Sequence, residues 1–252
     1  MMIIKIMMFL MLASPGKREN IRADKLWSDH LGNIYTLTDN SLHKYNQNWE
    51  LLSSYDWQAN GRITSVDISD PLRIVVFSVH ANQVVFLDQE LSLLSDPFNI
   101  DVLNYHDVAV VCKASTGGFW MFNNIDKQLI HINHNGNEDI KSGTIDIYSG
   151  FPEIMYEYSG HIYLGYPKQG IVVFNNQAAY EKCLPLTFEI AFEWHKNNII
   201  YLNNDKIFSY NIKLAKEDLI VSSLPDLKDF TLSGGVLYYI SNQQVKQKLL
   251  KD

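Results

Sequence analysis

Residues 28–46 read SDHLGNIYTLTDNSLHKYN: a turn, a short apolar strand, a second turn and a second strand. The first strand contains Ile34 and Tyr35, and the second ends at Tyr45, directly before an asparagine. An asparagine at that position can close the next turn by accepting hydrogen bonds from its own backbone. The stretch therefore predicts a β-hairpin, and the rest of the chain repeats its pattern.

The pattern occurs six times, at a spacing of about 40 residues. The matching first strands contain Ile34, Ile74, Phe119, Ile162, Ile200 and Leu237. The second strands read SLHKYN (41–46), QVVFLD (83–88), QLIHIN (128–133), GIVVFN (170–175), KIFSYN (206–211) and QVKQKL (244–249). Another apolar segment precedes each first strand, and a more polar segment follows most of the second strands. Each complete repeat therefore predicts four short strands.

A repeat of four antiparallel strands with this period is typical of a β-propeller blade. Such a sheet has two apolar faces, and it can bury both by packing against like sheets around an axis. A sandwich or a pair of barrels is the alternative, but neither needs the same four-strand pattern six times. We therefore predict an all-β chain with a single six-bladed β-propeller over residues 15–252. The predicted blades cover residues 24–57, 62–100, 106–146, 151–187, 188–224, and 226–252 with 19–23.

The last repeat ends at Asp252 with no residues left for a fourth strand. A ring with that gap would expose an unpaired sheet edge. We therefore predict that an N-terminal strand, residues 19–23, closes the last blade.

The N-terminus, MMIIKIMMFLMLAS (1–14), carries one lysine, a compact apolar run and small residues at its end. This pattern predicts a signal peptide, since the run is shorter than the roughly 20 apolar residues that span a bilayer. A first strand or a buried segment is the alternative. A signal peptide predicts export and a periplasmic location. The two cysteines, Cys112 and Cys183, fall in different repeats, and we predict two separate buried thiols, although a pair between them is the alternative.

The composition fits a packed all-β domain. Hydrophobic residues make up 46% of the 252 residues and charged residues 19%, with 14 tyrosines and 12 phenylalanines that favour strands. The formal net charge of −7 opposes binding to phosphate backbones, so no nucleic-acid partner is predicted.

Two stretches resemble known propeller families. GHIYLGYPKQGIVVFN (160–175) resembles the two-component regulator propeller repeat, with weaker copies at 117–133 and 32–46. ITSVDISDPLRIVVFSVHANQVVFLDQELSLL (63–94) resembles a blade of a family of small secreted propellers from Bacteroidota. The second resemblance implies a protein-binding role in the cell envelope, such as capping the periplasmic side of the type IX secretion translocon, an outer-membrane barrel.

The residues that could act in catalysis are not part of any known catalytic motif. No G-x-S-x-G, P-loop, G-x-G-x-x-G or H-E-x-x-H motif is present. His131 and His134 do not face each other on a strand, so we expect a surface or loop pair rather than a metal site. Glu157, Glu189 and Glu193 are possible acids on inner strands, but paired or solvated side chains are expected. We predict no enzyme, and no catalytic, cofactor-binding or metal-binding residues.

Asp29 is interpreted as a structural residue, and six aromatic residues are interpreted as candidates for partner binding. Asp29 is expected to bond backbone N–H groups across its turn. Aromatic residues at loops or strand ends are candidates for partner binding, because Trp and Tyr are enriched at binding hot spots. The candidates are Trp49, Trp57, Tyr105, Tyr148, Tyr158 and Trp194. The alternative for each is that it fills a gap between blades.

The sequence therefore predicts a non-enzymatic exported propeller that binds another protein in the envelope. Two alternatives remain open. One is a ligand-sensing propeller. The other is a hydrolase or lyase at the channel mouth, which would need at least three converging polar side chains.

Overall fold

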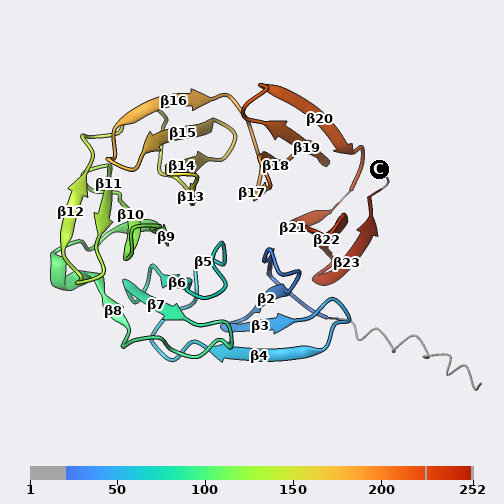
Figure 1. Ribbon diagram of the computed structural model, residues 1–252, viewed down its shortest axis with the longest axis horizontal. Coiled ribbons are helices and arrows are strands. Elements are labelled where there is room, and N and C mark those ends of the chain that lie inside the picture. Colours follow the sequence, from blue (N-terminus) through green and yellow to red (C-terminus); the bar gives the residue numbers. More distant parts are fainter. Residues whose placement is uncertain (1–20, 225, 251–252) are drawn as a thin grey trace, which may run out of the picture.

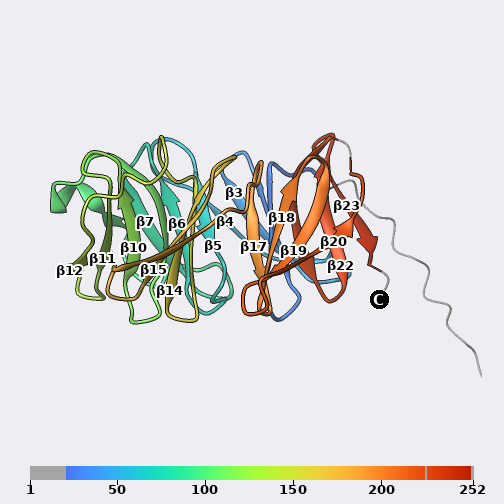
Figure 2. The ribbon, with the colours of Figure 1, turned by 90° about the horizontal axis from the view of Figure 1, so that it is seen from above.

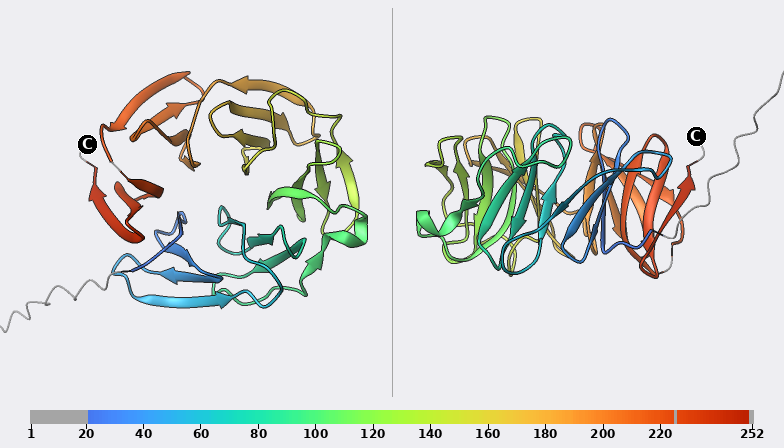
Figure 3. Two further views of the ribbon diagram at one scale, coloured as in Figure 1. Left: turned by 180° about the vertical axis from the view of Figure 1, so that it is seen from behind. Right: turned by 90° about the horizontal axis from the view of Figure 1, so that it is seen from below.

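The computed structural model describes residues 21–224 and 226–250, which form a ring of six antiparallel sheets (Figure 1). Seen from above, the ring is a disc with strands running between its two ends (Figure 2). We call the sheets blades 1 to 6 in chain order. The views from behind and from below show the same closed arrangement (Figure 3). The predicted fold class, an all-β six-bladed propeller, is confirmed.

Each blade is a meander of consecutive strands, with the first strand innermost and the last at the rim. Blades 1 to 3 contain β1 (Lys25–Ser28), β2 (Ile34–Thr38), β3 (Ser41–Tyr45), β4 (Leu51–Asp56), β5 (Ser65–Asp67), β6 (Ile74–Ser78), β7 (Gln83–Leu87), β8 (Phe98–Asn99), β9 (Val108–Lys113), β10 (Phe119–Asn123), β11 (Gln128–Ile132) and β12 (Glu138–Lys141). Blades 4 to 6 contain β13 (Ile154–Tyr158), β14 (His161–Tyr166), β15 (Gly170–Asn175), β16 (Tyr180–Leu184), β17 (Phe192–His195), β18 (Asn198–Asn203), β19 (Lys206–Asn211), β20 (Lys216–Val221), β21 (Leu227–Ser233), β22 (Val236–Ser241) and β23 (Gln244–Leu249).

The burial of each strand follows from its place in the blade. Every residue of β6 and β10 is buried, because second strands are covered on both faces by neighbouring blades. The outermost strands β4 and β12 have no fully buried residue, because they face solvent at the rim. This gradient explains why the fourth segment of each repeat is the most polar.

The core is divided among the junctions between blades. The described residues contain six clusters of buried side chains, and each cluster joins two neighbouring blades. Trp120 and Tyr166, for example, meet between blades 3 and 4. Leu26 and Tyr238 meet between blades 6 and 1. A single blade therefore has no core of its own, and the ring is the folding unit.

The ring closes where the N-terminal segment reaches blade 6, which has three strands of its own. Arg22 forms an antiparallel bridge with Gln244. The Ala23 N–H donates to the Gln243 carbonyl over 3.2 Å, and the Val245 N–H donates to the Ile21 carbonyl over 2.9 Å. The predicted closing of blade 6 by N-terminal residues is confirmed for residues 21–23, but as an isolated bridge with flanking hydrogen bonds rather than a regular strand, and residues 19 and 20 lie outside the described residues.

Blade 2 has an irregular outer edge. Its fourth strand, β8, has only two residues. The preceding chain is held in a turn by Asp88, whose Oδ1 accepts hydrogen bonds from the N–H groups of Glu90 and Ser92, each over 2.8 Å. A short 3-10 helix, η1 (Ile100–Leu103), follows the strand. This edge therefore leaves room for a hollow between blades 2 and 3.

Three further expectations concern the membrane and the cysteines. The predicted signal peptide, residues 1–14, lies outside the described residues. Among the residues that the structure describes, no helix has the length and apolarity needed to cross a membrane. Cys112 is buried and Cys183 is half-buried, and neither forms a disulfide. The prediction of two separate thiols is confirmed, and that of burial is confirmed for Cys112 but wrong for Cys183.

Candidate binding site at one mouth of the central channel

The innermost strands run in the same direction along the axis, so their ends gather at one end of the disc. There they surround a hollow with a volume of about 450 Å³, which we call the strand-end mouth. Its lining includes Ser28, His30, Ser69, Tyr158, Trp194 and Lys196. The mouth is therefore built from residues at or just after the ends of β1, β5, β13, β17 and β21.

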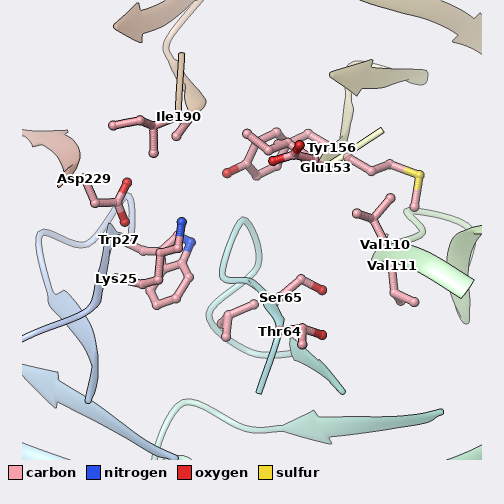
Figure 4. A pocket seen from close by; sticks show the side chains of 14 residues that line it. Lys25, Trp27, Thr64, Ser65, Val110, Val111, Glu153, Tyr156, Ile190 and Asp229 are labelled. Carbon is pink, nitrogen blue, oxygen red and sulfur yellow. The ribbon is translucent and has the colours of Figure 1, made fainter. Parts of the chain in front are cut away.

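A second hollow of about 120 Å³ lies in the channel, toward the beginnings of the same strands. It is lined from all six blades, and its labelled side chains face one central space (Figure 4). Tyr156 lies among them, and its pKa is raised well above the usual value by burial and by the charges of Asp67, Glu193 and Asp229. The phenol of Tyr156 is therefore held in its neutral form in the channel.

The acids of the innermost strands bond to the backbone of neighbouring blades. Each of four carboxylates accepts a hydrogen bond from an N–H group across a blade junction. The pairs are Asp67 with Lys113 N at 2.9 Å, Glu157 with Ser115 N at 2.7 Å, Glu193 with Leu232 N at 2.6 Å and Asp229 with Leu26 N at 2.8 Å. We call these contacts the carboxylate clamps. Two buried acids, Asp67 and Asp229, and two partly buried acids, Glu157 and Glu193, thus hold blades together at the axis.

Glu157 and Glu193 are therefore paired, as expected. Glu189 was placed on an inner strand by the sequence, and this placement is wrong, because the residue precedes β17. Its Oε1 accepts a hydrogen bond from the Asn204 N–H over 3.0 Å. Asp67 and Asp229 were missed. The signal for all four clamps is an acid within or at the end of the apolar segment that opens a repeat.

Glu193 has the most perturbed acid–base chemistry of the clamps. Burial raises its pKa to about 8, and the charge of Asp229 adds to this, while hydrogen bonds from Thr231 and Leu232 oppose it. The Thr231 hydroxyl lies 2.7 Å from Glu193 Oε2 and 2.7 Å from the Ser28 hydroxyl. Three polar side chains therefore converge here, but their hydrogen bonds connect blades 5, 6 and 1.

Asp229 and His195 are also shifted. Burial raises the Asp229 pKa to about 6, against the charge of Lys25 and the N–H groups of Leu26 and Phe230. At the mouth, the pKa of His195 is lowered by burial and by the charge of Lys196, although the Leu232 backbone acts in the opposite direction. The imidazole of His195 is therefore held toward its neutral form.

Tyr158 and Trp194 meet at the strand-end mouth. Their rings stack with centroids 4.0 Å apart and planes at 10°, joining blades 4 and 5. Tyr163 contacts Trp194 edge-on at 4.8 Å. The Tyr158 hydroxyl donates to the Lys196 carbonyl, which fixes the pair against the loop after β17. Two of the six predicted aromatic candidates thus form one rigid unit.

The other four candidates lie elsewhere. Trp57 is only 7% exposed and belongs to the core between blades 1 and 2, so its prediction as an exposed residue is wrong. Trp49 packs edge-on against Tyr238 at 5.6 Å, across the blade 6–1 junction. The hydroxyl of Tyr105 forms hydrogen bonds with Glu138 and Lys141, and the ring of Tyr148 packs on that of Tyr166.

The two histidines of the predicted pair, His131 and His134, lie in different environments. His131 is only 2% exposed, and the expectation of a surface position is wrong for it. Its Nδ1 lies 2.6 Å from Asp139 Oδ1 and its Nε2 lies 2.9 Å from the Gly117 carbonyl oxygen. His134 is exposed in the turn after β11. Within residues 21–224 and 226–250, no group of three or more His, Cys, Asp or Glu side chains is arranged to hold a metal ion.

Asp29 behaves as expected for a turn aspartate. Its Oδ1 accepts hydrogen bonds from the N–H groups of Leu31 and Asn33, each over 2.9 Å. Its Oδ2 accepts from the Tyr35 hydroxyl over 3.0 Å. These contacts make the lip of the strand-end mouth rigid.

No protein-family model matches the sequence, and no curated protein matches it either. Among solved structures, a streptogramin B lyase is similar over 96% of this chain and 86% of that chain, with a TM-score of 0.61 and 11% identity. PorZ of Porphyromonas gingivalis, an essential bacterial surface component of the type IX secretion system, is similar with a TM-score of 0.52 and 10% identity. That match covers 92% of this chain but 37% of PorZ. The Pan2 WD40 domain of Neurospora crassa is similar over 90% of this chain and 88% of the domain, with a TM-score of 0.57 and 9% identity. At these identities the likeness concerns the fold, and the chain is a six-bladed β-propeller.

Proposed function

We propose that this chain is a non-enzymatic, exported β-propeller that binds another protein in the cell envelope through its strand-end mouth. The observation that carries the proposal is the Tyr158–Trp194 stack beside a hollow of about 450 Å³. Aromatic side chains that are already immobilised lose little entropy on binding, and they dominate many protein interfaces.

The surroundings of the stack support a protein partner. Leu31 is 60% exposed and Leu72 is 66% exposed, and both lie in loops that follow innermost strands. These loops are at the same end of the disc as the mouth. Lys196 adds an exposed cation to the lining. Apolar side chains around an aromatic anchor, with charge at the edge, match the composition of protein interfaces.

The carboxylate clamps favour binding over catalysis. A general acid or base must reach the proton that it transfers. Glu157 and Glu193 instead bond to backbone N–H groups of the neighbouring blade. Their geometry supports a structural role, so we do not advance the hydrolase or lyase alternative.

For the partner, we propose the outer-membrane barrel of the type IX secretion translocon, capped from its periplasmic side. The resemblance of residues 63–94 to the small secreted propellers supports this, together with the predicted signal peptide over residues 1–14. The fold shared with PorZ agrees with this partner, but the same fold also occurs in a lyase and in a WD40 domain.

Site-specific photo-cross-linking in cells that produce the full chain tests the binding face. A benzophenone side chain at His30, in the mouth, is expected to yield one major adduct with an envelope protein. The same group at Leu219, which is 52% exposed on the outer strand β20, is the matched control and is expected to yield none. Trp194→Ala should abolish the His30 adduct, whereas Trp194→Phe should retain part of it.

Mass spectrometry of the adduct identifies the partner, and fractionation locates the chain. A large outer-membrane barrel in the adduct and a processed chain in the periplasm are expected. An equal adduct from both positions, or none from either, contradicts the binding face. Recovery of only a small soluble ligand at the mouth favours the sensor alternative and contradicts the proposal.

A further inference from the structure

A hollow lies between blades 2 and 3, away from the channel. It has a volume of about 290 Å³ and is lined by Arg73, Phe86, Phe98, Phe119, His134 and Gly136, among others. We call it the rim pocket. It forms because the outer strand of blade 2 is reduced to two residues, so the edge of that blade does not cover the space.

The pocket has an aromatic wall. The rings of Phe86 and Phe119 lie with centroids 6.2 Å apart, and those of Phe98 and Phe119 lie 5.6 Å apart in an edge-on contact. Phe119 is 2% exposed, so these rings are held by the core between the two blades. The wall is therefore preformed and offers apolar contact to a ligand.

Gly136 lies in the lining next to Phe98 of this wall. Its φ is +78°, and a Cβ atom at this position would lie 2.8 Å from Phe98 Cε2. The turn that carries it is fixed by Asn133 Oδ1, which accepts a hydrogen bond from the Asn135 N–H over 3.0 Å. A larger residue there would be strained and would press on the wall.

Arg73 is the one cationic guanidinium in the lining. Its guanidinium carbon lies 4.4 Å from the centroid of the Phe86 ring. Burial lowers its pKa, while the charge of Asp70 acts in the opposite direction. Among the described residues, the guanidinium forms neither a hydrogen bond nor an ion pair, and the Asp70 carboxylate instead lies 3.6 Å from Lys113 Nζ.

A half-buried guanidinium without an acceptor is poised for an anion. The contact with Phe86 explains where the group lies, but it leaves the five N–H donors unused. A carboxylate matches the planar fork of arginine with two parallel hydrogen bonds. Asp96 also lines the pocket, so a singly charged anion suits it better than a multiply charged phosphate.

We propose that the rim pocket binds an apolar carboxylate, with Arg73 holding the carboxylate and the phenylalanine wall holding the attached apolar group. A small organic acid and the C-terminal residue of a peptide present this same chemistry. The site does not depend on the proposed function at the strand-end mouth.

Calorimetric titration of the full chain with N-acetylphenylalanine and with its uncharged amide tests the proposal. We expect the acid to bind at least about tenfold more tightly than the amide, because only the acid pairs with Arg73. Arg73→Met should remove this preference. Arg62→Met, at an exposed arginine outside the pocket, should retain it.

A peptide that ends in phenylalanine, with a free or an amidated C-terminus, distinguishes the two sources. Binding of the free form indicates a peptide terminus, whereas binding of N-acetylphenylalanine alone indicates a small acid, and both support the site. Arg73→Lys keeps the charge and provides a second variant in case Arg73→Met does not fold. It should bind the acid more weakly than the wild type does. Equal affinity for acid and amide, unchanged affinity in Arg73→Met, or no binding at millimolar concentration overturns the proposal.

Discussion

At the scale of single residues, Glu193 shows how burial changes the chemistry of a side chain. Its carboxyl group lies between blades 5 and 6, and burial raises the pKa from 4.5 to about 8. The group is therefore largely protonated at neutral pH in the folded chain. In the unfolded chain it is solvated and loses its proton at the lower pH.

This difference predicts a pH dependence of stability. Because the folded pKa is the higher one, the contribution of Glu193 is fully present below about pH 4.5 and is lost as the pH rises to about 8. The free energy of unfolding should fall with a slope of up to about 1.4 kcal/mol per pH unit in that window. Glu193→Gln mimics the protonated acid and should flatten the slope between pH 6.5 and 8, measured by urea unfolding.

The range from pH 6.5 to 8 separates the effect of Glu193 from that of Asp229. Because the pKa of Asp229 is about 6, its effect on the free energy of unfolding has the same sign but falls at lower pH. Glu189→Gln is the matched control, since Glu189 lies outside the clamps, and it should leave the slope unchanged. A Glu193→Gln variant with the wild-type slope would contradict a neutral buried Glu193.

At the scale of elements, the carboxylate clamps connect strands that belong to different sheets. Asp67, at the end of β5, is 2% exposed and accepts the Lys113 N–H of β9. Its other oxygen accepts the Ser69 N–H over 2.9 Å. The backbone of an innermost strand has unpaired groups on its axis side, and the clamps satisfy some of them.

Asp67→Ala should therefore lower the free energy of unfolding by about 1–3 kcal/mol, because two backbone N–H groups lose their acceptor. Chemical denaturation measures the change. Asp218→Ala is the control: Asp218 is 60% exposed and pairs with Lys216 at the rim, and its loss should cost less than about 0.5 kcal/mol. Equal losses in the two variants would refute the role of the clamp.

At the scale of the whole molecule, the ring is closed without a covalent bond within blade 6, where residues 21–23 pair with β23 before the chain continues into β1 of blade 1. The junction between blades 6 and 1 is held by the Asp229 clamp on Leu26, by the bridge of Arg22 with Gln244, and by the core around Leu26 and Tyr238. Opening this junction exposes two blade faces at once. Every other blade is continuous in sequence from its innermost to its outermost strand.

Asp229→Ala should therefore increase local opening at this junction more than elsewhere. We expect faster amide hydrogen exchange in β1 and β23, while β10 and β14 keep their protection. Asp229→Asn retains an acceptor for the Leu26 N–H and should restore most of the protection. Uniformly faster exchange in all blades of Asp229→Ala would show that the ring opens without a weak point.

The architecture could be predicted from the sequence because its signals are local. Turn residues, the repeated hairpin and the period of about 40 residues are all visible along the chain, and the fold class follows from them. The candidate site was predicted only in part. Tyr158 and Trp194 were identified, but their stacking was not, because they belong to different repeats. Trp57 has polar neighbours in sequence, yet it turns back into the space between blades 1 and 2.

The sequence by itself determined six repeats, five of four strands and a last one of three, the closing of blade 6 by N-terminal residues and the absence of a catalytic motif. The tertiary structure decided which polar side chains meet. It converted inner-strand acids into clamps, raised the pKa of Glu193, and placed Arg73 over Phe86 with no acceptor. The physical reason is that the clamps cross blade junctions, and that the surroundings of Arg73 are completed by residues of the neighbouring blade. Burial, charge and hydrogen bonding at such a junction depend on residues about 40 positions apart or more, which only the closed ring brings together.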